Sequence, residues 1–401
     1  GYLALLLMGQ RTANWRFGLI VALVLRLLLL GAMPALSDDV YRFVWDGRML
    51  VNGLNPFAAV PATLLESGEV IPGLTSELFD QLNSPEYYTI YPPFAQATFG
   101  LAAYLSFHSL GGSVLVLKLL LLLCEGLGLW AIWRLLRKWN LPEHRLLLYA
   151  LNPLVIVEVM GNLHYEGAMV AFLLWAVVFL TEKKWGGAVL LWTLSITAKL
   201  LTRLLLPFLW SRLRKKTALL FYAGVLLLLV LSFAPLAGAV FWHGFGESLQ
   251  LYFRKFEFNA SIYYVIRWLG YQFKGYNVIQ SVGPVLGLLA ASVIGIGGLL
   301  DKKNDWPSLM ERSLWAITAY LFLATTVHPW YVILPLALSV FTRYRFPLVW
   351  TVLIGLTYIN YSYPEYRENL WVVGMEYVIV LAWMFGELSG KLRFRENLIA
   401  P

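Results

Sequence analysis

Long apolar segments recur along the whole chain, and they constrain its fold more than any other feature. Ser113–Leu136, Thr217–Leu236 and Leu370–Leu388 each have about the 17–25 residues that a helix needs to cross a bilayer. Of the 401 residues, 59% are hydrophobic and 13% are charged, against about 45–50% and about 25% in soluble domains. This excludes a soluble enzyme, a disordered chain and a nucleic-acid-binding domain. The sequence predicts an all-α polytopic membrane protein with a single domain over residues 1–401.

Charge orients the predicted spans, because Lys and Arg mark the cytoplasmic side of a membrane protein. Placing all basic clusters inside gives about twelve spans with both ends inside, and makes the net charge of +8 mainly a topology signal. This requires Trp185–Trp210 to form a shallow hairpin of two short helices, and assigns Phe94–Leu110 to the outer surface. The other candidate spans are Arg16–Leu36, Ser113–Leu136, Arg145–Asn162, Tyr165–Thr181, Thr217–Leu236, Asn277–Leu300, Arg312–Val327, Trp330–Phe341, Phe346–Asn360 and Leu370–Leu388.

Two long outer loops interrupt this scaffold, at residues 37–92 and 241–276. The first is acidic, because it contains eight Asp and Glu residues and only two basic residues. Ser37 is predicted to cap a helix in which Val40, Phe43 and later apolar residues recur at helical spacing. This pattern is typical of an amphipathic helix on a membrane surface. The second loop is basic and rich in aromatic residues.

The carboxylates of Asp38 and Asp39 open this helix, and two interpretations of them stay open. They suit the positive end of a helix dipole and so can simply cap the helix. Alternatively, one of them is a general base at the boundary where a soluble acceptor and a lipid-borne donor meet. Asp46 is expected to pair with Arg42, four residues earlier.

Several islands of sequence resemble a known enzyme family. They are Ser37–Gly47, Gly53–Phe57, Tyr91–Pro93, Asn152–Pro153, Gly161–Glu166 and Val327–Tyr331. They resemble the bacterial GT-C membrane glycosyltransferases, which are polyprenyl-phosphate-sugar-dependent mannosyltransferase-like proteins, and more loosely GPI mannosyltransferase I. The resemblance implies a GT-C fold with a catalytic aspartate in the first outer loop, which carries onto Asp38 and then Asp39. A second acidic motif would be His164-Tyr165-Glu166, where many relatives have an aspartate.

Further polar groups are expected at the outer side, each with a structural alternative. Asn162, His164 and Glu166 form either a site or a solvated loop tip. Lys199 and Arg203, four residues apart on one helical face, either snorkel or contact a phosphate. The aromatic residues of the second loop either anchor the interface or stack on sugar rings. The substrate-binding candidates are Tyr41, Arg42, Asp46, Tyr91, Asn162, His164, Glu166, Lys199, Arg203, Arg254, Lys255, Asn259, Tyr263, His328, Trp330 and Tyr331.

The resemblance implies an inverting glycosyltransferase of the bacterial cytoplasmic (inner) membrane, with its site on the extracytoplasmic side. The donor would be a polyprenyl-phosphate-linked monosaccharide, with mannose favoured, and the acceptor a glycan or lipid hydroxyl. Membrane lipids are the expected surroundings, nucleic acid is not a partner, and no metal is expected to be obligatory, although a divalent cation is left open. The alternatives are a lipid-linked-sugar flippase or small-molecule transporter, and a non-catalytic assembly subunit.

Overall fold

Helices account for nearly all regular structure in the part of the chain that the computed structural model describes, which is residues 15–238, 241–242, 244, 246–247, 254–363 and 366–392. The one β contact among these residues is an isolated parallel bridge between Phe258 and Thr326. The predicted all-α class is therefore confirmed. Residues 248–253 of the predicted second loop lie outside the described residues.

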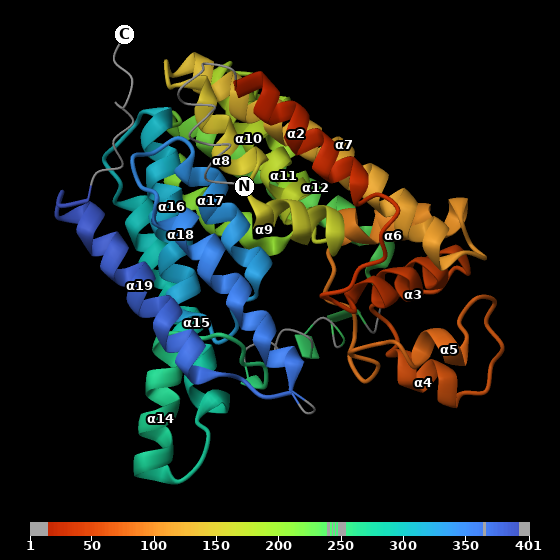
Figure 1. The fold of residues 1–401 in the computed structure, drawn as a ribbon. Coiled ribbons are helices and arrows are strands. Elements are labelled where there is room, and N and C mark those ends of the chain that lie inside the picture. Colours follow the sequence, from red (N-terminus) through yellow and green to blue (C-terminus); the bar gives the residue numbers. More distant parts are fainter. Residues whose placement is uncertain are drawn as a thin grey trace.

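The first half of the bundle surrounds a buried central helix, α10 (Glu166–Thr181). Every residue of α10 except Phe179 and Thr181 is buried, because its apolar side chains extend all round the helix. Figure 1 shows the long α7 alongside this group. α10 packs against α7 (Leu110–Lys138) and α11 (Trp185–Ala198), and α12 (Lys215–Phe233), which η4 (Ala234–Leu236) follows, packs against α11. α2 (Trp15–Leu28) also belongs to this half.

Two of the predicted helical segments are broken rather than continuous. Residues 143–161 form two pieces that are bent by 51°, and Asn152 at the bend caps the second piece by accepting hydrogen bonds from Leu154 N and Val155 N. The predicted hairpin at residues 185–210 breaks at Lys199, whose backbone is extended. The short elements are η1 (Glu143–Leu146), α8 (Leu147–Ala150), α9 (Pro153–Val155), the π-helix η2 (Ile156–Gly161) and the 3₁₀ helix η3 (Leu200–Leu209).

The second half of the bundle is built from the C-terminal helices, which Figure 1 shows in teal and blue beside the first half. Its members are α14 (Ile262–Lys274), α15 (Ile279–Leu299), α16 (Trp306–Leu323), η5 (Pro329–Val332), α17 (Ile333–Ser339), α18 (Phe346–Leu353), η6 (Ile354–Ser362) and α19 (Leu370–Leu388). Figure 1 also shows α14 at the same end of the bundle as α3, α4 and α5. This arrangement agrees with two long loops on one side.

Four helices in the described part of the chain are long and apolar enough to cross a membrane, and a fifth span results if the bent pair counts as one. The four are Leu110–Lys138, Lys215–Leu236, Ile279–Leu299 and Leu370–Leu388. The remaining apolar helices are shorter, including α10 and α11. The total of about twelve spans stays a prediction.

The first outer loop forms a small helical layer, made of α3 (Asp39–Val51), α4 (Pro61–Glu66), α5 (Ser76–Phe79) and α6 (Pro93–Leu105). α3 is covered on more than one side, since nine of its 13 residues are buried; its position on a membrane surface stays a prediction. Its apolar face packs against α6, and Trp45 and Met49 on the other side pack with Leu78 and Leu82. At 13 residues, α6 is about 20 Å long and too short to cross the hydrocarbon core of about 30 Å.

The contact between α3 and α6 depends on Gly47. A Cβ atom added there would lie 2.3 Å from the backbone oxygen of Phe99, and backbone cannot move aside without shifting α6. We expect Gly47→Ala to lower the free energy of unfolding by about 1–3 kcal/mol, measured as the thermal midpoint of the detergent-solubilised protein. Gly53→Ala does not serve as a control, because the positive φ of Gly53 would strain an alanine there. Gly111 is the better control, since a Cβ atom added to it would lie in open space. Gly111→Ala should leave the midpoint unchanged, and an equal loss in both variants would contradict this account.

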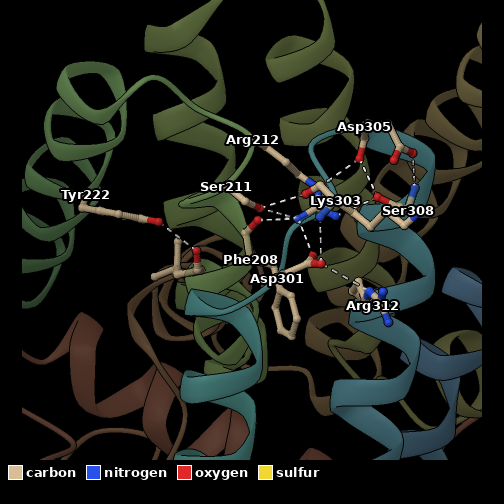
Figure 2. Close-up of polar contacts among 10 residues, drawn as sticks. Phe208, Ser211, Arg212, Tyr222, Asp301, Lys303, Asp305, Ser308 and Arg312 are labelled. Carbon is tan, nitrogen blue, oxygen red and sulfur yellow. Dashed lines mark hydrogen bonds and ion pairs between the residues drawn. The ribbon is translucent and has the colours of Figure 1, made fainter.

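A polar cluster ties the two halves together at the end opposite α14 (Figure 2). Arg212 donates to the carboxylate of Asp301 at 3.0 Å and to the backbone oxygen of Asp305 at 3.0 Å. Ser211 donates to the backbone oxygen of Lys303, and Arg312 lies 3.5 Å from Asp301. The basic residues after η3 and after α15 are therefore at the same end, in keeping with their predicted placement on one side.

Candidate functional site

Asp38 and Asp39 stand at the start of α3. Asp38, rather than the predicted Ser37, occupies the N-cap position, but its side chain makes no capping hydrogen bond and is exposed. Ser37 instead accepts a hydrogen bond from Asp39 N at 3.3 Å. Capping therefore does not account for the exposed carboxylate of Asp38.

The carboxylate of Asp39 is half-buried and held by neighbours. Asn83 donates to its Oδ1 at 3.0 Å. Burial, reinforced by the charge of Asp39, raises the pKa of Tyr91 well above its ordinary value, so Tyr91 stays a protonated donor at neutral pH. Asp39 thus serves as a fixed acceptor, and Asp38 is the less encumbered of the two.

The expected ion pair between Arg42 and Asp46 is present, with Nε 2.7 Å from Oδ1 and both side chains buried. Gln96 donates to the second oxygen of Asp46 at 2.8 Å. Arg42 also donates to the backbone oxygen of Tyr87 at 2.9 Å. These contacts fasten α6 and residues 84–89 to α3. Tyr41, one residue before Arg42, is partly buried and packs against the core.

The loop between η2 and α10 brings a second set of polar side chains to α3. Asn162 accepts a hydrogen bond from Leu36 N at 3.2 Å, just before the aspartates, and donates to Glu158 at 3.1 Å. Tyr358 of η6 donates to the other oxygen of Glu158 at 2.6 Å. Asn162 and Glu158 are fully buried. The structural alternative for Asn162, a place in a solvated loop tip, is therefore excluded.

Lys199 is the cation of this region, and it lies where the hairpin breaks. Its Nζ is 3.0 Å from Oε1 of Glu166 and 5.9 Å from the ring centre of Tyr331. The second oxygen of Glu166 is buried and has no hydrogen-bond partner among the described residues. The loop that carries Glu166 also carries Asn162, which accepts the hydrogen bond from Leu36 N just before the aspartates, so contacts link the Lys199 pair to the start of α3.

The expectation that Arg203 shares a helical face with Lys199 is wrong. Lys199 has extended backbone angles, and Arg203 belongs to the 3₁₀ helix η3, which has about three residues per turn. Arg203 is exposed and acts electrostatically on Tyr320 of α16. The structure therefore brings Lys199 to the site and directs Arg203 to another helix.

A stack of four rings joins the two halves beside Lys199. His164 lies on one face of Trp330 at 3.6 Å between ring centres, and His328 lies on the other face at 4.5 Å. Phe258 then stacks on His328 at 4.7 Å. Both faces of Trp330 are covered, so this ring has no face left for a sugar. The stack is a connector that fixes the distance between loops far apart in the sequence.

The two histidines in this stack carry no charge at neutral pH. Burial and the nearby charge of Lys199 lower the pKa of His328 to about 3. The same causes, with His328 in addition, hold the pKa of His164 well below its ordinary value. Either imidazole can donate a hydrogen bond, but neither supplies a positive charge to a phosphate. Lys199 is left as the cation that this part of the described structure offers.

The second loop contributes through Phe258 and Asn259. Asn259 is fully buried with a φ of 47°, which is strained for a residue with a side chain. Its N–H donates to Glu368 at 2.5 Å, and its amide lies 3.2 Å from both oxygens of Glu376. Leu163, beside His164, has a φ of 66°. Strained residues that the surroundings hold in place are typical of functional sites.

The other candidates of the second loop are Arg254, Lys255 and Tyr263. Arg254 and Lys255 are exposed. Tyr263 is buried in a separate apolar cluster with Ile279 and Leu286, and its hydroxyl donates to Asn277 at 2.5 Å. Tyr263 therefore braces the turn between α14 and α15.

Sequence reasoning missed three residues that complete the site. Tyr358 holds Glu158, Asn83 holds Asp39, and Glu368 holds the Phe258 loop. A polar contact of Tyr358 could have been expected from the sequence, because a tyrosine in an apolar segment needs a hydrogen-bond partner when it is buried. Asn83 and Glu368 lie in loops without a recognisable pattern.

No group of three or more His, Cys, Asp or Glu side chains that could hold a metal occurs among the described residues. One carboxylate of the region, that of Glu166, already pairs with Lys199. Whether a divalent cation takes part in catalysis stays a prediction.

Comparison with known proteins identifies the family of this chain. Residues 3–214 match the family model described as alpha-(1->6)-mannopyranosyltransferase, N-terminal domain. Alpha-(1->6)-mannopyranosyltransferase A of Mycobacterium tuberculosis is 26% identical over 343 residues, which are 78% of this chain and 62% of that protein. Alpha-(1->6)-mannopyranosyltransferase B of Corynebacterium glutamicum is 28% identical over 142 residues, or 35% of this chain and 23% of that protein.

The chain thus spans less than two thirds of the length of these curated relatives. The matched region holds the aspartates, the loop before α10 and Lys199. Because the family model covers more than half of the sequence, the chain belongs to the MptA/B family of alpha-(1->6)-mannopyranosyltransferases.

Proposed function

We propose that this protein is an integral membrane mannosyltransferase. It moves mannose from a polyprenyl-phosphate donor to the hydroxyl of an extracytoplasmic glycan or lipid, with inversion at the anomeric carbon. The observation that carries the proposal is a chain of contacts between the start of α3 and Lys199. Leu36 N donates to Asn162, and Glu166 of the same loop pairs with the partly exposed Lys199. Asp38, two residues after Leu36, has an exposed carboxylate. Family membership supports the sugar, since the relatives are named as mannopyranosyltransferases.

The proposed roles follow from the charges. Asp38 takes the proton of the acceptor hydroxyl while the acceptor oxygen attacks the anomeric carbon. The bond to the lipid phosphate breaks, and the negative charge that develops on the phosphate is stabilised by Lys199. Asp39, held by Asn83, keeps the start of α3 in place. Two charges of opposite sign on either side of the sugar suit a direct displacement.

Replacing Lys199 tests the cation directly. We expect Lys199→Gln to lower kcat by about 10²–10³-fold, the usual cost of removing one group that stabilises developing charge. Lys199→Arg should recover part of the rate because it keeps the charge. Lys184→Gln is the matched control, since Lys184 pairs with Glu182 at an exposed position. A normal kcat in a folded Lys199→Gln protein would remove Lys199 from the mechanism.

The second candidate function is a flippase or transporter, because the fold is a bundle of apolar helices. Transporter sites are typically built at the bilayer midplane, whereas Asp38 and Asp39 begin a helix of the first outer loop. Proteoliposomes that contain a labelled polyprenyl-phosphate mannose and an acceptor separate the two. Transfer with release of lipid phosphate supports the proposal, and translocation of the intact donor without transfer supports the alternative.

A further inference from the structure

A groove of about 790 Å³ runs between α14, α16 and α19, outside the cluster of charged groups. Along α19 its lining residues are Leu370, Val373, Gly374, Tyr377, Val378 and Leu381. These positions recur every three or four residues, so they form one face of the helix over about 16 Å. The groove is therefore a channel along a helix that is apolar and long enough to span a membrane.

Four polar side chains that line the groove, those of Ser261, Tyr264, Arg267 and Tyr377, are engaged with the protein. Ser261 donates to the backbone oxygen of Phe322 at 2.8 Å, and the hydroxyl of Tyr264 donates to Glu368. Arg267 pairs with Glu257, and its guanidinium lies 4.1 Å from the ring centre of Tyr264. What remains for an occupant is aromatic and aliphatic surface. Such a channel suits a hydrocarbon chain and offers little to a sugar or a peptide.

One end of the groove adjoins the site. Ala260 and Ser261 follow Phe258 and Asn259 directly, and Phe258 stacks on His328. Glu368 precedes the start of α19 and holds both Asn259 N and Tyr264. A chain that leaves the groove at this end arrives beside the ring stack and Lys199.

We propose that this groove binds the hydrocarbon chain of the lipid-borne donor, which rests on the proposed function above. The walls formed by Val265, Trp268 and Val378 are 60%, 60% and 67% exposed, so the groove opens outward and a chain can enter from the bilayer. Binding along α19 would orient the donor with its phosphate toward Lys199. The groove would thus determine the preference of the enzyme for donors with long chains.

Gly374→Trp tests this proposal, because a Cβ at Gly374 meets no atom within 4 Å and the indole can fill the groove. We expect kcat/KM for a long-chain polyprenyl-phosphate mannose, relative to a water-soluble short-chain analogue, to fall at least about tenfold. That factor equals the loss of about two buried methylene groups. Gly297→Trp is the matched control, since Gly297 also has open space but lies on α15 away from the groove. In Gly297→Trp, the ratio of kcat/KM for the long-chain donor to kcat/KM for the short-chain analogue should match that of the wild type. An unchanged ratio in Gly374→Trp would overturn the proposal.

A labelling experiment separates this proposal from the proposed function. A polyprenyl phosphate with a photoreactive group on its chain is incorporated into phosphatidylglycerol vesicles that contain the wild-type protein. We expect labelled peptides from α14 and α19, protected by unlabelled polyprenyl phosphate but not by excess phospholipid. Labelling of peptides from other helices only, or loss of the label when phospholipid alone is added, would overturn the groove assignment. Absence of mannose transfer by the wild type, with labelling intact, would instead overturn only the proposed function.

Discussion

The Asp38→Asn protein is expected to transfer mannose about 10²–10⁴-fold more slowly than the wild type, the range for loss of a positioned general base. Asparagine keeps the size and position of the side chain but cannot take a proton. Because the Asp38 side chain makes no capping hydrogen bond, the substitution should not disturb α3. Initial rates with a polyprenyl-phosphate mannose donor measure the effect on kcat.

Two further variants test whether the loss of rate is specific to Asp38. Glu69→Gln removes an exposed carboxylate from the same loop and should leave the rate unchanged. Asp39→Asn should have a smaller effect than Asp38→Asn, since the amide oxygen can still accept the hydrogen bond from Asn83. A larger loss in Asp39→Asn than in Asp38→Asn would contradict the assignment and move the base to Asp39.

The largest expected effect on stability is at Arg26, a fully buried cation between α2, α7 and α8. Its Nη2 donates to Oε2 of Glu125 at 2.8 Å, and its Nη1 donates to the backbone oxygen of Ala150 at 2.7 Å. Tyr149 donates to the other oxygen of Glu125. Arg26→Met leaves Glu125 as a buried charge without its cation, which is expected to cost about 3–5 kcal/mol of unfolding free energy. Thermal unfolding in detergent would show the lower midpoint.

Two controls distinguish loss of the ion pair from loss of packing. Arg134→Met breaks a pair with Glu182 that is partly exposed, and should cost no more than about 1 kcal/mol. The double variant Arg26→Met/Glu125→Met should recover much of the lost stability, since no unpaired charge stays buried. If the double variant is less stable than Arg26→Met alone, the unpaired charge is not the cause.

Local patterns in the sequence were enough to predict the scaffold. Apolar runs placed most helices close to their observed bounds, and the charged Lys199 within the apolar stretch 185–210 indicated the break found there. The Arg42–Asp46 pair followed from the spacing of four residues on a helix. Each of these features depends on neighbours in the sequence.

The features that sequence reasoning missed depend on distant residues. Helical periodicity indicated that one face of α3 is apolar, but not that α5 covers a second face. The stacking of His164 and His328 on Trp330 joins loops about half the chain apart, which no local pattern predicts. Lys199 and Arg203 diverge because η3 is a 3₁₀ helix rather than an α-helix, a distinction that its apolar sequence does not reveal.

The central claim is that this protein joins mannose from a lipid phosphate to an acceptor hydroxyl by means of Asp38. The most direct measurement follows purified protein in vesicles with doubly labelled polyprenyl-phosphate mannose and counts both products. The account predicts one released lipid phosphate for each mannose transferred by the wild type, and loss of both products together in Asp38→Asn. Lipid phosphate released without mannose transfer, or equal transfer by wild type and Asp38→Asn, would contradict it.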